Sequence, residues 1–111
     1  ALRDQGVLIF GSGNIVHNLR DAMRRLGQSD APVPSWASDF DRDVASALEQ
    51  RDTAFLARAA ATDLGRMAHP SVDHYLPLLY VAGAANAQDP LSFPIQGFDA
   101  GSISMRAVRF G

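Results

Sequence analysis

The sequence contains no cysteine and no lysine among its 111 residues. Without cysteine, the chain can form neither a disulfide scaffold nor a thiolate zinc site, and it has no thiol nucleophile. This usage fits the cytosol, so we expect a cytoplasmic protein. Without lysine, a phosphate-binding P-loop is excluded. The net charge of -2 gives no overall attraction for nucleic acid or for an anionic membrane surface.

The sequence also lacks a long hydrophobic run and a signal-peptide pattern. Its length suits one domain or part of one. The chain begins at Ala1 without a methionine, and we therefore expect it to be the tail of a longer polypeptide.

A buried strand is predicted at Val7–Phe10, a continuous run of strand-forming apolar residues between two glycines. Apolar side chains on both faces of a strand require protein layers on both faces of its sheet. A glycine-rich turn at 11–14 follows, and a helix is predicted from this turn to about Leu26. The few strands of this chain are not enough to enclose 7–10, which indicates that more sheet belongs to the intact molecule.

The middle of the sequence predicts four helices, each with a recognisable start. Their predicted ranges are 39–50 with Ser38 as N-cap, 52 or 53 to about 60, 62–68, and 72–85 with Ser71 as N-cap. In the range 39–50, Asp41 is expected in the first turn, where the helix dipole favours it, and one apolar stripe is expected, formed by Phe40, Val44, Ala47 and Leu48. Pro77 lies inside the last range and should either kink that helix or move its start later.

The C-terminal region predicts two strands, 91–98 and 102–110, joined by a hairpin turn at Gly97–Gly101. Pro94 limits the first of these strands to an edge or an irregular position. The order of one strand, several helices and a hairpin indicates a layered α/β unit with about three strands and four to five helices.

The three histidines lie at predicted element boundaries, where side chains can converge on a small molecule. Histidine suits both metal ligation and proton transfer near neutral pH. The alternatives are an ordinary surface histidine at His17 and a junction residue at His69, because proline follows it. His74 lies in an apolar segment and needs a partner. His69 and His74 are five residues apart, which is not the helical His-x-x-x-His zinc spacing.

Two further functions for the glycine turn, nucleotide binding and hydrolysis, have little support in the sequence. The turn lacks the G-x-G-x-x-G spacing of nucleotide-binding loops. The chain also lacks the G-x-S-x-G nucleophile elbow, so a hydrolase that uses Ser12 as nucleophile and His17 as base has little support.

Three segments resemble the C-terminal half of class III extradiol ring-cleavage dioxygenases of the 4,5-DOPA dioxygenase type, in the LigB-like superfamily. They are Gly11–Arg20, Ala68–Leu78 and Gly97–Arg106, which read GSGNIVHNLR, AHPSVDHYLPL and GFDAGSISMR. Together they extend over nearly the whole chain, and the paired histidine motifs are quite specific.

The resemblance implies a three-layer α/β/α fold with a mononuclear non-haem iron(II) site that zinc sometimes occupies. The reaction that it implies opens a catechol ring by inserting both atoms of O2. His74 matches a metal-ligand position. His17 matches the acid–base histidine, which some descriptions count among the metal ligands. His69 belongs to the motif without an assigned role.

The resemblance also implies a part that this sequence does not contain, because the family supplies further metal-ligating histidines from its N-terminal half. We therefore expect residues 1–111 to be the C-terminal portion of one catalytic domain, inactive without the other half. Expected partners are a catechol-type substrate, O2 and that missing half. The alternative is a non-catalytic binding or assembly module that keeps the fold and has lost the chemistry.

Overall fold

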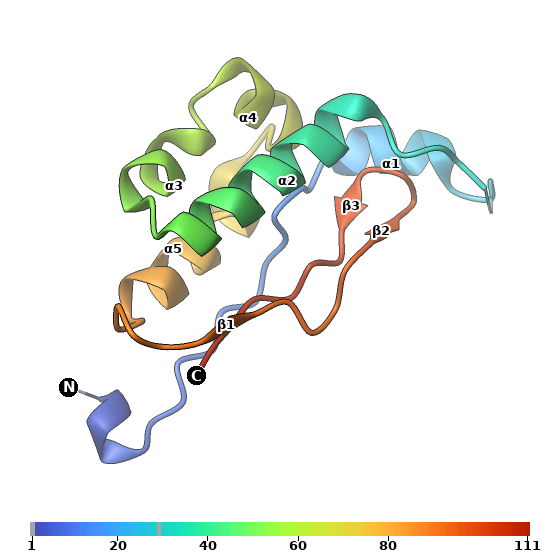
Figure 1. Cartoon of the computed structure of the whole chain (residues 1–111). Coiled ribbons are helices and arrows are strands. Elements are labelled where there is room, and N and C mark those ends of the chain that lie inside the picture. The colour runs from blue at the N-terminus through green and yellow to red at the C-terminus, as the bar shows by residue number, and fades with distance from the viewer. Residues whose placement is uncertain (1, 29) are drawn as a thin grey trace.

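A computed structural model describes residues 2–28 and 30–111 of the chain (Figure 1). The short 3-10 helices are η1 (Arg3–Gln5) and η2 (Val72–His74), and the α-helices are α1 (Leu19–Arg25), α2 (Ser35–Gln50), α3 (Thr53–Ala59), α4 (Asp63–Ala68) and α5 (Leu76–Gly83). The strands are β1 (Leu91–Ser92), β2 (Phe98–Asp99), β3 (Ile103–Ser104) and β4 (Arg109–Phe110). A mixed α/β fold is therefore confirmed.

Helix α2 is the centre of the hydrophobic core. The stripe predicted from its sequence, Phe40, Val44, Ala47 and Leu48, is buried along one face of the helix. In Figure 1 helices α2 to α5 gather on one side of the molecule, and the C-terminal strands run along the other. The core contains Ile15, Val16, Ala37, Phe40, Val44, Ala47, Leu48, Leu56, Ala59, Ala68 and Tyr75.

The start of α2 corrects the sequence prediction. The helix begins at Ser35, after the extended Pro34, and not after Ser38. Pro34 fixes φ near -66°, and its carbonyl accepts the first helical hydrogen bonds, including one from Ala37 N at 3.0 Å. The Ser38 hydroxyl instead donates to the Ser35 carbonyl within the helix, at 2.9 Å.

Helices α3 and α4 begin where the sequence predicts. The Asp52 carboxylate accepts a hydrogen bond from Phe55 N at 2.8 Å, and the Thr62 hydroxyl accepts one from Gly65 N at 3.0 Å. Each cap gives a partner to an amide that the helix itself leaves unpaired. Pro77 moves the start of the last helix to Leu76, because proline is accommodated in the first turn of a helix.

The two long predicted strands are broken into short pieces. Strand β1 pairs antiparallel with β4, and β2 pairs antiparallel with β3, so the described residues form two separate two-stranded pairs. The β2–β3 hairpin turns through Ala100 and Gly101, which both have positive φ angles. Arg106 and the other residues between the two pairs follow an irregular path along the core.

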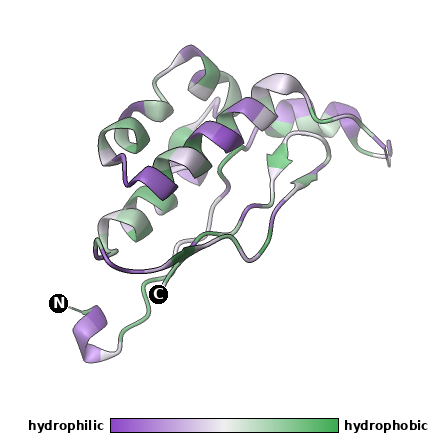
Figure 2. Ribbon diagram, in the orientation of Figure 1, coloured by the Kyte–Doolittle hydropathy of each residue, from purple (hydrophilic) through white to green (hydrophobic). Residues whose placement is uncertain are grey.

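The buried strand predicted at Val7–Phe10 is not formed in the described structure. These residues have no regular secondary structure, and the side chains of Leu8 and Phe10 are 85% and 82% exposed. No backbone hydrogen bond joins residues 8–13 to another described residue. Figure 2 shows this apolar segment running outside the helical core. A strand needs a neighbouring strand to form, and no described segment lies in that position.

The described helices are all too short or too polar to cross a lipid bilayer.

Candidate active site

The segment 14–17 crosses the molecule between the β2–β3 hairpin and the end of α4. On the hairpin side, Ser104 N donates to the Val16 carbonyl at 3.0 Å, and Asn14 Nδ2 donates to the Ser104 carbonyl at 2.9 Å. On the other side, His17 N donates to the Ala68 carbonyl at 3.0 Å. Hydrogen bonds on both sides therefore fix the backbone that carries His17.

His17 precedes α1 and does not lie on it, which corrects the predicted helix start. It forms an isolated antiparallel bridge with Ile103. Helix α1 begins only at Leu19, because Asn18 is its N-cap and accepts a hydrogen bond from Asp21 N at 3.0 Å. The His17 side chain is therefore attached to a backbone that pairs with the β2–β3 hairpin.

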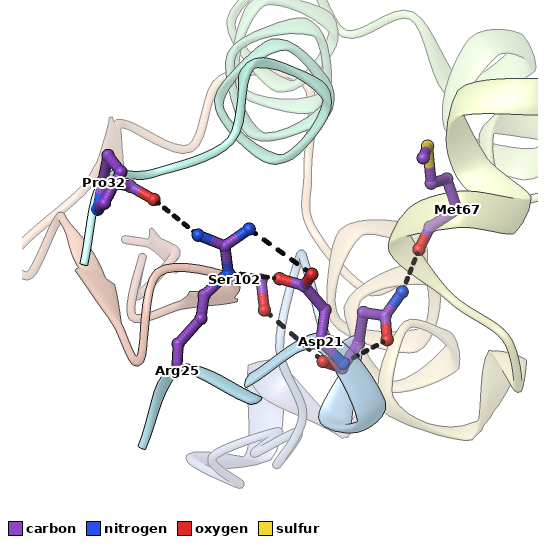
Figure 3. A network of polar contacts seen from close by, with 6 residues as sticks. Asp21, Arg25, Pro32, Met67 and Ser102 are labelled. Carbon is purple, nitrogen blue, oxygen red and sulfur yellow. Dashed lines mark hydrogen bonds and ion pairs between the residues drawn. The ribbon is translucent and has the colours of Figure 1, made fainter. Parts of the chain in front are cut away.

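A network around Asn18 connects this cap to its neighbours (Figure 3). Asn18 Nδ2 donates to the Met67 carbonyl at 2.9 Å, and the Ser102 hydroxyl donates to the Asn18 carbonyl at 3.4 Å. Asp21, which the cap holds, forms an ion pair with Arg25 at 2.8 Å. The residue that follows His17 is thus bonded to α4 on one side and to the hairpin on the other.

The structure places His17 and His74 against each other, although 56 positions separate them in the sequence. Their ring centroids are 3.6 Å apart and the ring planes are inclined by 19°, which is a stacked pair. His74 ends η2, and its carbonyl accepts a hydrogen bond from Asn14 N at 2.8 Å. This bond connects the segment that carries His17 directly to His74.

A cavity of about 520 Å³ lies beside the pair. The segment 7–15, helix α5 and residues 104–110 line it, and His74 is the histidine that reaches it. His74 is exposed and His17 is half-buried behind it. A small molecule in this cavity would therefore meet the His74 imidazole first.

The glycine turn allows this close approach. A Cβ atom on Gly13 would lie 2.2 Å from the His74 carbonyl oxygen, and one on Gly11 would lie 2.9 Å from the Pro77 carbonyl oxygen. Only glycine lets two backbones come so near. The glycine turn is thus a packing surface for η2 and α5.

His69 lies apart from the stacked pair and inside the core. Its side chain is 3% exposed, and Nε2 lies 2.6 Å from the Ile15 carbonyl oxygen. That contact requires a proton on Nε2, so the neutral ring has its lone pair on Nδ1. Nδ1 is buried and has no hydrogen-bond partner in the described structure. His69 therefore supports the segment before His17 and does not face the cavity.

Two of the histidines are held in the neutral form. Burial, followed by the electrostatic effect of His74, lowers the pKa of His17 below the usual 6.5. Burial also lowers the pKa of His69, and the hydrogen bond to Ile15 opposes this only in part. A neutral imidazole can accept a proton or bind a metal ion, so near neutral pH His17 is in the form that either role needs.

The arrangement limits how the pair could bind a metal. Within residues 2–28 and 30–111, no group of three or more His, Cys, Asp or Glu side chains is placed to hold an ion. Ring planes inclined by 19° at this separation meet far beyond a metal–nitrogen bond of about 2.1 Å. As the rings lie, one ion cannot be in the plane of both, so the pair offers one ligand and one adjacent base.

Sequence reasoning missed a buried polar cluster behind the cavity. The Asp41 carboxylate accepts hydrogen bonds from the Ser104 hydroxyl at 2.6 Å and from Arg106 Nη2 at 2.6 Å. Asp41 was expected in the first turn of its helix, where the helix dipole favours it. Because α2 begins at Ser35, Asp41 lies further along and is only 5% exposed. Ser104 and Arg106 are two positions apart and therefore share one face of the predicted strand 102–110, and this pattern could have indicated a polar cluster.

Comparison with known proteins gives relatives with a consistent name, although no protein-family model matches the chain. It is 40% identical to the 4,5-DOPA dioxygenase extradiol of Escherichia coli strain K12, over 100% of this chain and 41% of the relative. It is 30% identical to the 4,5-DOPA dioxygenase extradiol of Portulaca grandiflora, over 98% of this chain and 40% of the relative. These relatives confirm the resemblance found in the sequence.

A solved structure shares the fold. An uncharacterized protein of Escherichia coli K12 superposes with a TM-score of 0.86 at 38% identity, over 99% of this chain and 45% of that chain. The chain spans about two fifths of the length of the curated relatives it matches.

Gly13→Ala should disturb the histidine pair, because the new methyl group would collide with the His74 carbonyl. The expected result is loss of the nuclear Overhauser effect between the His17 and His74 ring protons, with lower thermal stability. Gly83→Ala is the matched control, since a Cβ there meets nothing within 4 Å. An unchanged ring-to-ring signal in Gly13→Ala would contradict the described packing.

Acidification should destabilise the protein through His69. Its pKa is lowered in the folded state, so the unfolded chain binds the proton more readily and stability is lost as the pH falls below about 6.5. His69→Gln keeps a donor for the Ile15 carbonyl but cannot titrate. Urea unfolding at about pH 7.5 and about pH 5.5 should show a smaller loss in this variant than in the wild type. An equal loss would contradict the prediction.

Proposed function

We propose that this chain, which is related along its whole length to 4,5-DOPA extradiol dioxygenases, provides His17 and His74 to an enzyme that opens catechol-type rings with O2. The observation that carries the proposal is the stacked pair at 3.6 Å, with His74 at a cavity wide enough for an aromatic ring. Both residues lie in the segments that resemble the family.

His74 is proposed as the metal ligand. Its imidazole is exposed at the cavity, and imidazole is a donor that suits iron and zinc. Iron(II) is the proposed ion, with zinc(II) as an alternative occupant, and iron(II) when bound would supply the reactivity toward O2. One imidazole cannot hold such an ion alone, because catalytic sites of this kind use about three protein ligands. The other ligands must come from outside the described residues.

His17 is proposed as the acid–base residue, and the geometry favours this role over that of a second ligand. Its lowered pKa keeps the ring neutral near pH 7, ready to accept a proton from a catechol hydroxyl and later to return one. Its backbone is bonded on both sides, which holds the ring beside the cavity. Direct ligation by His17 would require its ring to rotate out of the stack.

The remainder of the active protein is proposed to pack on the segment Val7–Phe10. Leu8 and Phe10 are largely exposed, and within the described part of the chain the backbone of residues 8–13 has no hydrogen bond to another segment. The relatives are more than twice as long as this chain. Strands from a missing N-terminal half would bury this segment and complete a three-layer α/β/α domain, of which residues 1–111 would be the C-terminal portion.

A second candidate is a non-catalytic binding or assembly module with the same fold. The observation that favours it is the lack of a three-ligand group among the described residues. The two functions differ in one measurable property, because only the enzyme needs additional ligands from the rest of the intact protein.

The two histidines should differ when they are replaced in the intact protein. His74→Ala should lower bound iron together with turnover. His17→Ala should lower turnover by about 10²–10⁴-fold and leave more of the iron bound. O2 uptake over a panel of catechols and metal analysis of the purified variants measure both effects. Met67→Ala, at an exposed position, is the control. Full ring-cleaving activity in both histidine variants would refute the assignment.

The 111-residue chain alone should be inactive, because it lacks a complete set of ligands. The purified chain, given iron(II) and a catechol, is expected to consume no O2. A longer natural polypeptide that contains it, or the chain mixed with the complementary part, should consume O2. Turnover by the isolated chain would show that these residues suffice for the site.

A further inference from the structure

Asp41 is an acidic residue inside an apolar surface. It lies between Phe40 and Val44 on α2, where the neighbouring side chains form the core. Its side chain is 7% exposed and that of its partner Arg106 is 13% exposed. Arg106 Nε and Nη2 both donate to Asp41 Oδ2, at 3.0 Å and 2.6 Å, and the Ser104 hydroxyl donates to Oδ1 at 2.6 Å. The carboxylate is therefore fully engaged.

Arg106 is fixed from its other sides as well. Nη1 donates to Gln96 Oε1 at 3.2 Å, and the guanidinium carbon lies 4.8 Å from the centre of the Phe93 ring. Arg106 and Ser104 also line the cavity that His74 reaches. The cluster of Asp41, Ser104 and Arg106 thus forms a rigid wall behind the candidate site.

The cluster holds the strand that pairs with His17. Asp41 binds the Ser104 side chain, while the Ser104 backbone binds both Val16 and Asn14. The adjacent Ile103 forms the bridge with His17. Hydrogen bonds therefore connect the core helix α2 through Ser104 to Val16 and Asn14, in the segment that carries His17.

We infer that Asp41 is a positioning residue, which acts through Ser104 and Arg106 to set the His17 ring against His74. A buried ion pair contributes little net stability compared with apolar residues of similar size, so stability alone does not explain its presence here. What the Asp41–Arg106 ion pair does is to fix the register of β3 against the segment 14–17. The catalytic consequence rests on the proposed function, whereas the placement of the two rings does not.

The test replaces the whole pair by apolar residues in the intact protein, with Asp41→Leu combined with Arg106→Met. This double variant leaves no unpaired buried charge, so it is expected to fold. The matched control is Asp39→Leu with Arg42→Met, a pair on the same helix at 2.7 Å whose side chains are 42% and 68% exposed. Three readouts apply to each: urea unfolding, the nuclear Overhauser effect between the His17 and His74 rings, and kcat with KM for a catechol.

The expected result is near wild-type unfolding with loss of the ring-to-ring signal, and a kcat lower by about 100-fold at a similar KM. The control pair should change none of these. A folded double variant that retains the ring-to-ring signal would overturn the inference. Where the double variant does not fold, Ser104→Ala decides. It removes only the Ser104 hydroxyl, which donates to Asp41 and accepts from Arg106 N at 3.2 Å, and it leaves the buried ion pair in place. A retained signal there also overturns the inference.

The two proposals fail in different ways. If the wild-type protein opens no catechol, the proposed function fails, and the ring-to-ring signal alone decides the role of Asp41. If the wild type is active and the double variant keeps both its signal and its kcat, the role of Asp41 fails and the proposed function stands.

Discussion

The hydrogen bonds on both sides of the segment 14–17 are the constraint on which the rest of the site depends. One side is bonded to Ser104 and the other to Ala68 and His74. These contacts join three regions that are distant in the sequence. A backbone held in this way cannot shift toward either neighbour without breaking bonds, so the Cα atom that carries the His17 ring is fixed in place. The cavity, the stacked pair and the buried cluster all lie around this segment.

The packing of the core supports the same segment from below. Ile15 and Val16 belong to the hydrophobic core, together with Phe40 and Tyr75. Tyr75 OH donates to the Leu56 carbonyl at 2.9 Å, and burial raises the pKa of the phenol, which keeps it in the donating form. The residue that follows His74 is thus fixed by α3, while His69 fixes the residue two before His17. Apolar burial and a few polar contacts act at the same points.

Sequence patterns predicted the local features well. The apolar stripe of α2, the starts of α3 and α4, and the effect of Pro77 each depend on a few adjacent residues, and each appears in the structure. The histidine motifs and the family resemblance singled out residues that the structure places together. Neither could give the stacked geometry of the pair, because that depends on a close backbone contact between Gly13 and His74.

The features that sequence reasoning missed depend on long-range partners. The burial of Asp41 follows from residues 104 and 106, which lie more than 60 positions away. The strand predicted at 7–10 has the right composition, but a strand forms only when another one pairs with it. His17 lies outside a helix because Asn18 is the N-cap of α1. Other residues of the predicted turn could also have capped this helix, so the sequence alone does not determine where it starts.

The open segment at 7–10 has a practical consequence for work with the purified chain. Leu8 and Phe10 are largely exposed, beside backbone groups with no hydrogen bond to another residue that the structure describes, as at an unprotected sheet edge. Copies of the chain at high concentration can satisfy these groups by adding to one another, edge to edge. Preparations should therefore be kept dilute, and light scattering should be measured with every spectrum to detect self-association.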